Sequence, residues 1–151
     1  MGNVSYTLHH WASGNQFVVT WASLSSTSNG MDIGEIFPRQ ADLALGSALF
    51  SDKSVQVIRP ASNDTQVIMR GSNQPTLNPT ATGSFVFATL TDPQGNGLIL
   101  PPAGQSTWIE AITENCAFIS PRVASTSFVG SDNGITVHLL LSSTRASRSG
   151  V

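Results

Sequence analysis

The chain of 151 residues is predicted to fold as one all-β domain, residues 1–151, built as an antiparallel β-sandwich or jelly roll of about eight strands. Two observations carry this prediction. Short segments with strand character recur at intervals of roughly 8 to 15 residues, with turn-forming residues between them. Only residues 41–50 could form a short helix, and Gly46 weakens that segment because glycine disfavours helix interiors.

The strands are assigned from the alternation of side chains, since neighbouring residues of a strand point to opposite faces of a sheet. In the second segment, for example, Phe17, Val19 and Trp21 share one face. Pro121 is expected to place its segment at a sheet edge or at a bulge, because proline lacks the N–H that a ladder uses. The expected strands are residues 4–11, 16–24, 54–58, 65–70, 84–90, 108–113, 117–124 and 135–142.

The charge content is unusually low. Charged residues make up 11% of the chain, against about 25% in typical soluble domains, and Lys53 is the only lysine. Serine, threonine, asparagine and glutamine take the place of charged residues. This composition favours a β-protein whose surface is covered by neighbours in an oligomer, fibre or shell. An extracellular β-domain with a neutral, hydroxyl-rich surface remains the alternative.

The same composition argues against two classes of partner. A net charge of −2 does not favour nucleic-acid binding, which usually shows a basic patch. No run of 18 or more apolar residues occurs, so no membrane span is expected. The N-terminus lacks the charged and apolar regions of a secretory signal.

The residues that could coordinate a metal or attack a substrate are not arranged for either task. His9 and His10 are neighbours and would point to opposite faces of a strand. With His138 and the single cysteine Cys116 they show no spacing of zinc ligands, and Cys116 lies in an apolar run where a buried thiol is the usual case. The chain is therefore expected to be no enzyme and to have no cofactor and no metal site.

The carboxylates are also expected to have structural roles. On one strand, Glu110 and Glu114 would be separated by about 13 Å, beyond the roughly 5 to 9.5 Å that glycosidases use. Asp92, Pro93 and Gly95 occupy the first, second and fourth positions that a type I turn favours. The segment 92–96 is therefore expected to be a corner between strands rather than a ligand loop.

Several segments, read in order, resemble a family of small structural proteins of tailed bacteriophages, the capsid cement or decoration proteins. Two departures from that pattern are the long loop at residues 74–84 and the insertion at residues 31–49. The matching segments are 51–58 (SDKSVQVI), 67–73 (VIMRGSN), 88–96 (ATLTDPQGN), 109–115 (IEAITEN), 118–123 (FISPRV) and 135–137 (ITV), with 21–24 (WASL) near the start.

This resemblance implies a structural protein of the virion, not an enzyme. Cement proteins bind the outer face of the expanded phage head, typically as homotrimers, and hold neighbouring major capsid protein subunits together against the pressure of packed DNA. By this resemblance, an N-terminal arm (residues 1–12) and a C-terminal tail (residues 143–151) are expected to touch neighbouring subunits. The candidate interface residues are Trp11, Trp21, Arg39, Arg145 and Arg148, with core packing as the alternative for both tryptophans.

A second hypothesis is a carbohydrate- or receptor-binding β-sandwich module of a phage tail or an adhesin. Sugar sites use exposed aromatic side chains, so an exposed Trp108 beside Arg70 or Arg122 would favour it. A third, a projecting domain of a small icosahedral virus, shares the composition but not the order of the motifs.

Overall fold

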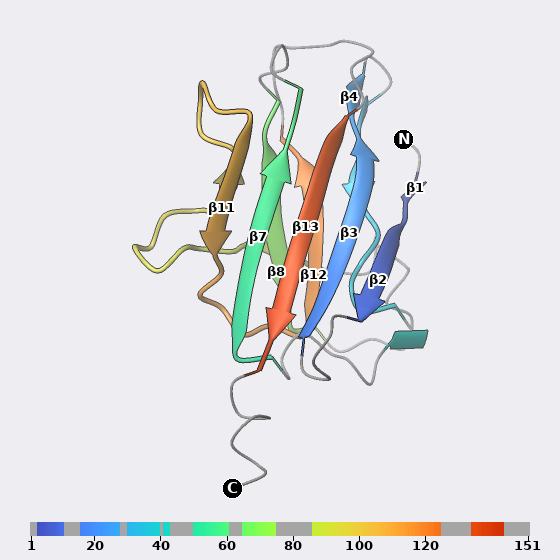
Figure 1. Cartoon of the computed structure of the whole chain (residues 1–151), viewed down its shortest axis with the longest axis vertical. Coiled ribbons are helices and arrows are strands. Elements are labelled where there is room, and N and C mark those ends of the chain that lie inside the picture. The colour runs from blue at the N-terminus through green and yellow to red at the C-terminus, as the bar shows by residue number, and fades with distance from the viewer. Residues whose placement is uncertain are drawn as a thin grey trace, which may run out of the picture.

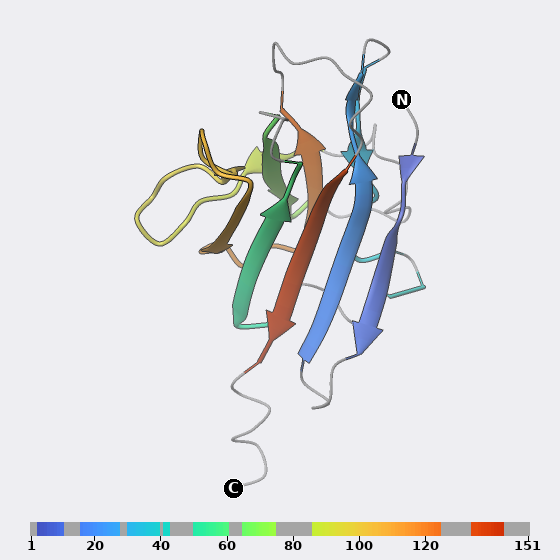
Figure 2. The ribbon, with the colours of Figure 1, turned by 45° about the horizontal axis from the view of Figure 1, so that its top comes forward.

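A computed structural model describes residues 3–10, 16–27, 30–39, 41–42, 50–60, 65–74, 86–124 and 134–143. These residues form two stacked β-sheets, seen from the side of the five-stranded sheet in Figure 1 and in a tilted view in Figure 2. The predicted all-β sandwich is confirmed. Ala41 and Asp42 adopt 3₁₀ geometry, and residues 43–49 of the expected short helix lie outside the described residues.

The front sheet of Figure 1 has five antiparallel strands, of which β13 is the central one. In order across the sheet they are β11 (Thr107–Ala111), β7 (Asp52–Ile58), β13 (Ile135–Ser142), β3 (Gln16–Leu24) and β2 (Tyr6–His10).

The second sheet has six strands, and β12 and β8 lie at its centre, behind the front sheet. Every pairing in it is antiparallel except that of β1 with β6. The strands are β1 (Asn3–Val4), β6 (Ile33–Gly34), β12 (Phe118–Val123), β8 (Val67–Ser72) and β10 (Ile99–Leu100), with β9 (Ala88–Thr89) also paired to β8. A separate ladder joins β4 (Ser26–Thr27) to β5 (Gly30–Met31).

The pairing of eight of these strands is nested. The first of them, β3, pairs with the last, β13, and inside this pair β6 joins β12, β7 joins β11 and β8 joins β10. Folding such a nested ribbon into two sheets places β13 beside β7 and β12 beside β8. This is the topology of a jelly roll, one of the two architectures that the strand spacing predicted.

The hydrophobic core lies between the two sheets. Alternate residues of β7 and β13 are buried and the residues between them are more exposed, as the period of a strand requires. Each large apolar side chain buried in this way contributes about 1.5–3 kcal/mol. The largest fully buried side chains include Trp21, Phe37, Leu24, Ile36, Met69 and Ile119.

The N-terminal segment is part of the sandwich and not an arm over its described length. Residues Asn3–Val4 pair with β6, and Tyr6–His10 pair along β3. The ring of Tyr6 is buried in the core. The expected arm at residues 1–12 is therefore corrected for residues 3–10. Of the expected tail, 143–151, only Ser143 is described.

Pro121 lies in a central strand, so the expected edge position was wrong, but the alternative, a bulge, is confirmed. Arg122 pairs with Ile33 and Ile119 pairs with Phe37, so three residue steps on β12 face four on its partner. Alternate N–H groups of β12 point toward β6, as shown by the bonds from Ile119 N to Phe37 O and from Val123 N to Asp32 O. Pro121 has no N–H to give there, but Ser120 Oγ donates to Gly34 O at 2.8 Å. The hydroxyl of the preceding residue thus satisfies a carbonyl beside the proline at the bulge.

The absence of a side chain at Gly34 allows this arrangement, which yields a first prediction. A Cβ at this position would lie 2.6 Å from Pro121 Cγ and 2.8 Å from Trp21 Cδ1. We expect Gly34→Ala to lower the free energy of unfolding by about 1–3 kcal/mol, as overpacking does. Urea denaturation measures this change. Gly97→Ala is the control, because its nearest contact would be an ordinary 3.4 Å to Thr89 Cγ2; equal losses in both variants would contradict the steric explanation.

Candidate functional site

Two of the five expected interface residues are described, and the first is a core residue. The side chain of Trp21 is fully buried, and its Nε1 donates to the backbone oxygen of Glu35 at 2.8 Å. Its expected role as an interface anchor is therefore corrected, because in this fold the indole reaches no surface. Trp11, Arg145 and Arg148 lie outside the described residues.

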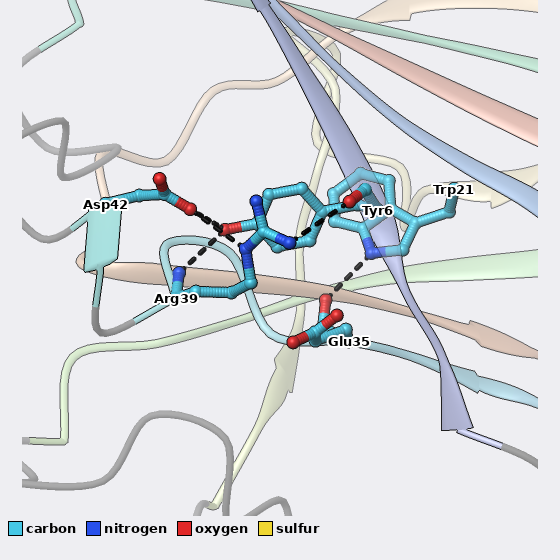
Figure 3. A network of polar contacts seen from close by, with 5 residues as sticks. All are labelled: Tyr6, Trp21, Glu35, Arg39 and Asp42. Carbon is cyan, nitrogen blue, oxygen red and sulfur yellow. Dashed lines mark hydrogen bonds and ion pairs between the residues drawn. The ribbon is translucent and has the colours of Figure 1, made fainter.

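Arg39, the second, takes part in a network with Tyr6 and Asp42 (Figure 3). Tyr6 Oη donates to Asp42 Oδ2 at 2.6 Å and accepts from the backbone N–H of Arg39 at 2.7 Å. Arg39 Nε donates to the same carboxylate oxygen at 3.0 Å, while the guanidinium lies 4.1 Å from the centre of the Tyr6 ring. The network joins Arg39 and Asp42 to β2.

Burial and hydrogen bonding within this network shift the pKa values of Tyr6 and Arg39. Desolvation, followed by the hydrogen bond to Asp42, raises the pKa of Tyr6 well above its ordinary value. Burial by itself would lower the pKa of Arg39, but its contacts with Asp42 and Tyr6 outweigh burial and the pKa is raised. About a third of the Arg39 side chain is exposed, 34%. Its contacts with Tyr6 and Asp42 stabilise the fold, and its role as an interface anchor stays a prediction.

The corner at residues 92–96 is a self-contained turn, as the sequence predicted. The N–H of Gly95 donates to the carbonyl of Asp92 at 2.9 Å, the bond that closes a β-turn. Asp92 Oδ1 accepts from the backbone N–H groups of Gln94 and Asn96, each at 2.9 Å. The Asp92 carboxylate therefore stabilises the turn itself, and the residue is buried.

The remaining reactive side chains have structural partners. Glu114 accepts hydrogen bonds from the backbone N–H and the hydroxyl of Thr91. Although burial alone would raise the pKa of Glu114, these bonds lower it. Lys53 is buried at the end of β7, and its Nζ donates to Phe50 O and Asn115 Oδ1; burial lowers its pKa. Cys116 is also buried. Within the described residues, no group of three potential metal ligands gathers.

The outer face of the five-stranded sheet lacks charge across its centre. The pairing registers place two complete rows of side chains across all five strands. Neither row contains a lysine, arginine, aspartate or glutamate. One row is Ile109, Gln56, His138, Thr20 and Thr7, and the next is Ala111, Ser54, Leu140, Val18 and His9.

This face is hollowed into an open groove of about 590 Å³. Ile109 is 64% exposed and Leu140 is 38% exposed. Thr20 Oγ1 and His138 Nδ1 are hydrogen-bonded at 2.9 Å. The groove offers apolar surface and neutral hydrogen-bonding groups, with His9, Gln16, Val18, Thr20, Ser54, Gln56, Ile109, His138 and Leu140 as its lining.

The outer face of the second sheet differs, because it carries two arginines. Arg70 of β8 lies directly opposite Ser120 of β12, and Arg122 lies two residues further along β12 on the same face. Arg122 is exposed and Arg70 is partly buried. Burial, and then the neighbouring charge of Arg122, lower the pKa of Arg70 to about 10.

Comparison with known proteins adds no relative. No protein-family model matches the chain. No curated protein and no solved structure matches it either. In the part of the chain that the structure describes, no helix is both long and apolar enough to span a membrane.

The observation that would favour a sugar site is met only in part. Trp108 is 36% exposed, but its Nε1 donates to Glu110 Oε2 at 3.3 Å. Among the described residues, the ring that lies against the Arg70 guanidinium is that of Phe87. Sequence reasoning missed that Arg70 and Arg122 adjoin each other. Alternation along each strand indicates that both point outward, but the register that brings them together is set by strands about fifty residues apart.

Proposed function

We propose that this chain is a structural protein of a virion, a cement protein that binds the outer face of a phage head and stabilises the major capsid protein shell. The observation that carries the proposal is the pair of uncharged rows across the outer face of the five-stranded sheet. The exposed face of a soluble domain normally carries charged residues. A wide face without them is typical of a surface that neighbouring subunits of an assembly cover, either further copies of the same chain or subunits of the shell.

Two further features support the proposal. The motif order resembles that of cement proteins, and a jelly roll is a common fold of virion proteins. Since a jelly roll also serves lectins, the fold by itself does not decide between a shell protein and a sugar-binding protein. Charged residues make up only 11% of the whole chain. This low content favours a shell protein over a sugar-binding protein, because many like subunits can then pack closely without mutual repulsion.

The groove favours one other candidate, a carbohydrate-binding module. Its glutamines, histidines and hydroxyl groups could bind sugar hydroxyls. However, among the residues that the structure describes, no phenylalanine, tyrosine or tryptophan lines the groove, and sugar sites commonly stack their ligand on such rings. We therefore rank this candidate below the cement protein.

The copy number of the chain in its source particle tests the proposal. We expect about one copy for each major capsid protein subunit, because a cement protein follows the symmetry of the shell. Quantitative mass spectrometry of purified particles, with the capsid protein as internal reference, measures the ratio. A few copies per particle would indicate a tail module and favour the sugar-binding candidate. The absence of the chain from particles would overturn the proposed function.

A further inference from the structure

Arg70 and Arg122 form a pair of like charges on adjacent strands. Their positions are diagonal neighbours on the outer face of the second sheet, because Arg70 lies opposite Ser120 and Arg122 lies opposite Ile68. Diagonal neighbours of this kind have Cα atoms about 7–8 Å apart, within reach of long side chains. Two guanidinium groups therefore share one small area of surface.

The Arg70 guanidinium is held in place by contacts that leave its charge uncompensated. Its Cζ lies 4.4 Å from the centre of the Phe87 ring. Its Nη2 donates to Ser120 Oγ at 3.2 Å, and the Ser120 hydroxyl in turn donates to Gly34 O. Ser120 is fully buried. The sheet thus orients Arg70 firmly without giving it an anion.

No carboxylate pairs with either arginine in the described part of the chain, where the one ion pair is that of Arg39 with Asp42. The positive charge of Arg122 instead repels that of Arg70 and so helps to lower the pKa of Arg70. Like charges side by side on a sheet destabilise the fold. An arrangement that costs stability and orients one guanidinium is typical of a site that binds an external anion.

The surroundings of the pair indicate which kind of molecule supplies that anion. The row of Arg122 continues through Ile68 to Ile99, which is 43% exposed. Val86, next to Phe87 in the chain, is 79% exposed. A pair of arginines among exposed aliphatic side chains has the composition of a protein–protein interface. A nucleic-acid site would instead show a broad basic patch, and the chain as a whole is acidic.

We infer that the outer face of the second sheet is the surface that docks on the shell, and that Arg70 and Arg122 receive an aspartate or glutamate side chain of the major capsid protein. A guanidinium binds a carboxylate through two parallel hydrogen bonds, which gives both energy and orientation. The aliphatic side chains around the pair exclude water and so strengthen the contact. This inference rests on the proposed function, because it names the partner that the cement role supplies.

The test measures the binding of purified protein to particles that were assembled without this chain. The variants are Arg122→Glu, which reverses one charge, and Arg122→Lys, which keeps the charge but loses the two-pronged geometry. The double variant Ala103→Glu/Gln105→Glu is the control. It makes the same change of two in net charge at exposed positions of the loop between β10 and β11. Thermal unfolding of each variant is measured in parallel.

We expect Arg122→Glu to bind at least about 30-fold more weakly than the wild type, as the loss of a central arginine contact does. We expect Arg122→Lys to show a smaller loss and the control to bind like the wild type. The melting temperature of Arg122→Glu should equal or exceed that of the wild type, since the substitution removes the repulsion and offers Arg70 a carboxylate. If the variant is more stable than the wild type and yet fails to bind, misfolding cannot explain its loss of binding.

Three other outcomes would overturn the inference. If Arg122→Glu binds like the wild type, the arginine pair does not contact the shell, although the cement role stands. If the control loses as much affinity as Arg122→Glu, the effect is general repulsion between negative surfaces. If the wild-type protein itself does not bind the particles, the cement role fails, and the inference fails with it.

Discussion

Trp21→Ala is expected to lower the free energy of unfolding by about 3–5 kcal/mol, the range found for removing a large aromatic side chain from a core. Trp21 is fully buried between the sheets, where its ring meets the ring of Tyr6 edge to face at a centroid distance of 5.8 Å. The substitution leaves a cavity, and it also leaves the carbonyl of Glu35 without the donor it has now. Since whole domains are stable by only about 5–15 kcal/mol, this loss is a large part of the total.

Urea denaturation followed by circular dichroism measures the change. Trp108→Ala is the matched control, because it removes the same side chain from an edge strand at which the ring is 36% exposed. We expect the control to lose less than Trp21→Ala, about 1–2 kcal/mol, since about a third of the residue is already in water. If Trp21→Ala fails to fold, Trp21→Phe gives the milder comparison, with a loss of about 1–3 kcal/mol from the unsatisfied Glu35 carbonyl. Equal losses at positions 21 and 108 would contradict the assignment of Trp21 to the core.

The sequence left two roles open for Trp21, an interface anchor and a core residue, and the structure places it in the core. Tryptophan contributes most where it is desolvated, and both cores and interfaces provide such places. The sequence shows that Trp21 shares a face with Val19, but that face could meet either the opposite sheet or a partner. Only the packing of this face against the second sheet, where the indole contacts Gly34 and Glu35, decides between the two.

The features that sequence reasoning predicted correctly are local ones. The strands at Gln16–Leu24 and Ile135–Ser142 match their expected ranges, because alternation is visible within a single segment. The corner at Asp92 was predicted for the same reason, since all of its bonds join residues within four positions of each other.

The features that it missed depend on segments distant in the chain. Pro121 can lie in a central strand because Ser120 Oγ reaches Gly34 O, 86 residues away in the sequence. The expected strand at residues 84–90 shrinks to Ala88–Thr89 among its described residues. There Leu90 N bonds Met69 O across the sheet. The contact of Arg70 with Arg122 likewise arises from the register of β8 with β12, which no property of either segment alone determines.

The network around Tyr6 also joins residues that are far apart in the sequence, Tyr6 with Arg39 and Asp42. It leads to a prediction for alkaline pH. Tyr6 is the only tyrosine of the chain, so the ultraviolet absorbance of tyrosinate reports on this residue alone. In the unfolded chain its pKa is about 10, whereas in the folded protein burial and the Asp42 carboxylate raise the pKa well above that value. We expect native protein to show no tyrosinate absorbance at about pH 11, and denatured protein to show it in full.

The raised pKa also makes the stability depend on pH with a definite sign. Below about pH 10 both states keep the phenolic proton, so the contribution of Tyr6 is fully present. Above that pH the unfolded chain releases a proton that the folded chain retains, and the free energy of unfolding falls by up to about 1.4 kcal/mol per pH unit. Between about pH 10 and pH 12 the expected loss is therefore about 2.5 kcal/mol. It continues until the pH passes the raised pKa.

Tyr6→Phe isolates this contribution from groups that act in the opposite direction. The pKa of Lys53 and that of Arg70 are lowered by burial, so each of these cations loses its proton earlier in the folded state and adds stability as the pH rises. Both groups remain in Tyr6→Phe, and subtracting its curve of unfolding free energy against pH from that of the wild type leaves the Tyr6 effect alone. The difference should be constant up to about pH 10 and then shrink steadily. A difference that stays constant to pH 12 would mean that the phenol of Tyr6 titrates normally and is not buried against Asp42.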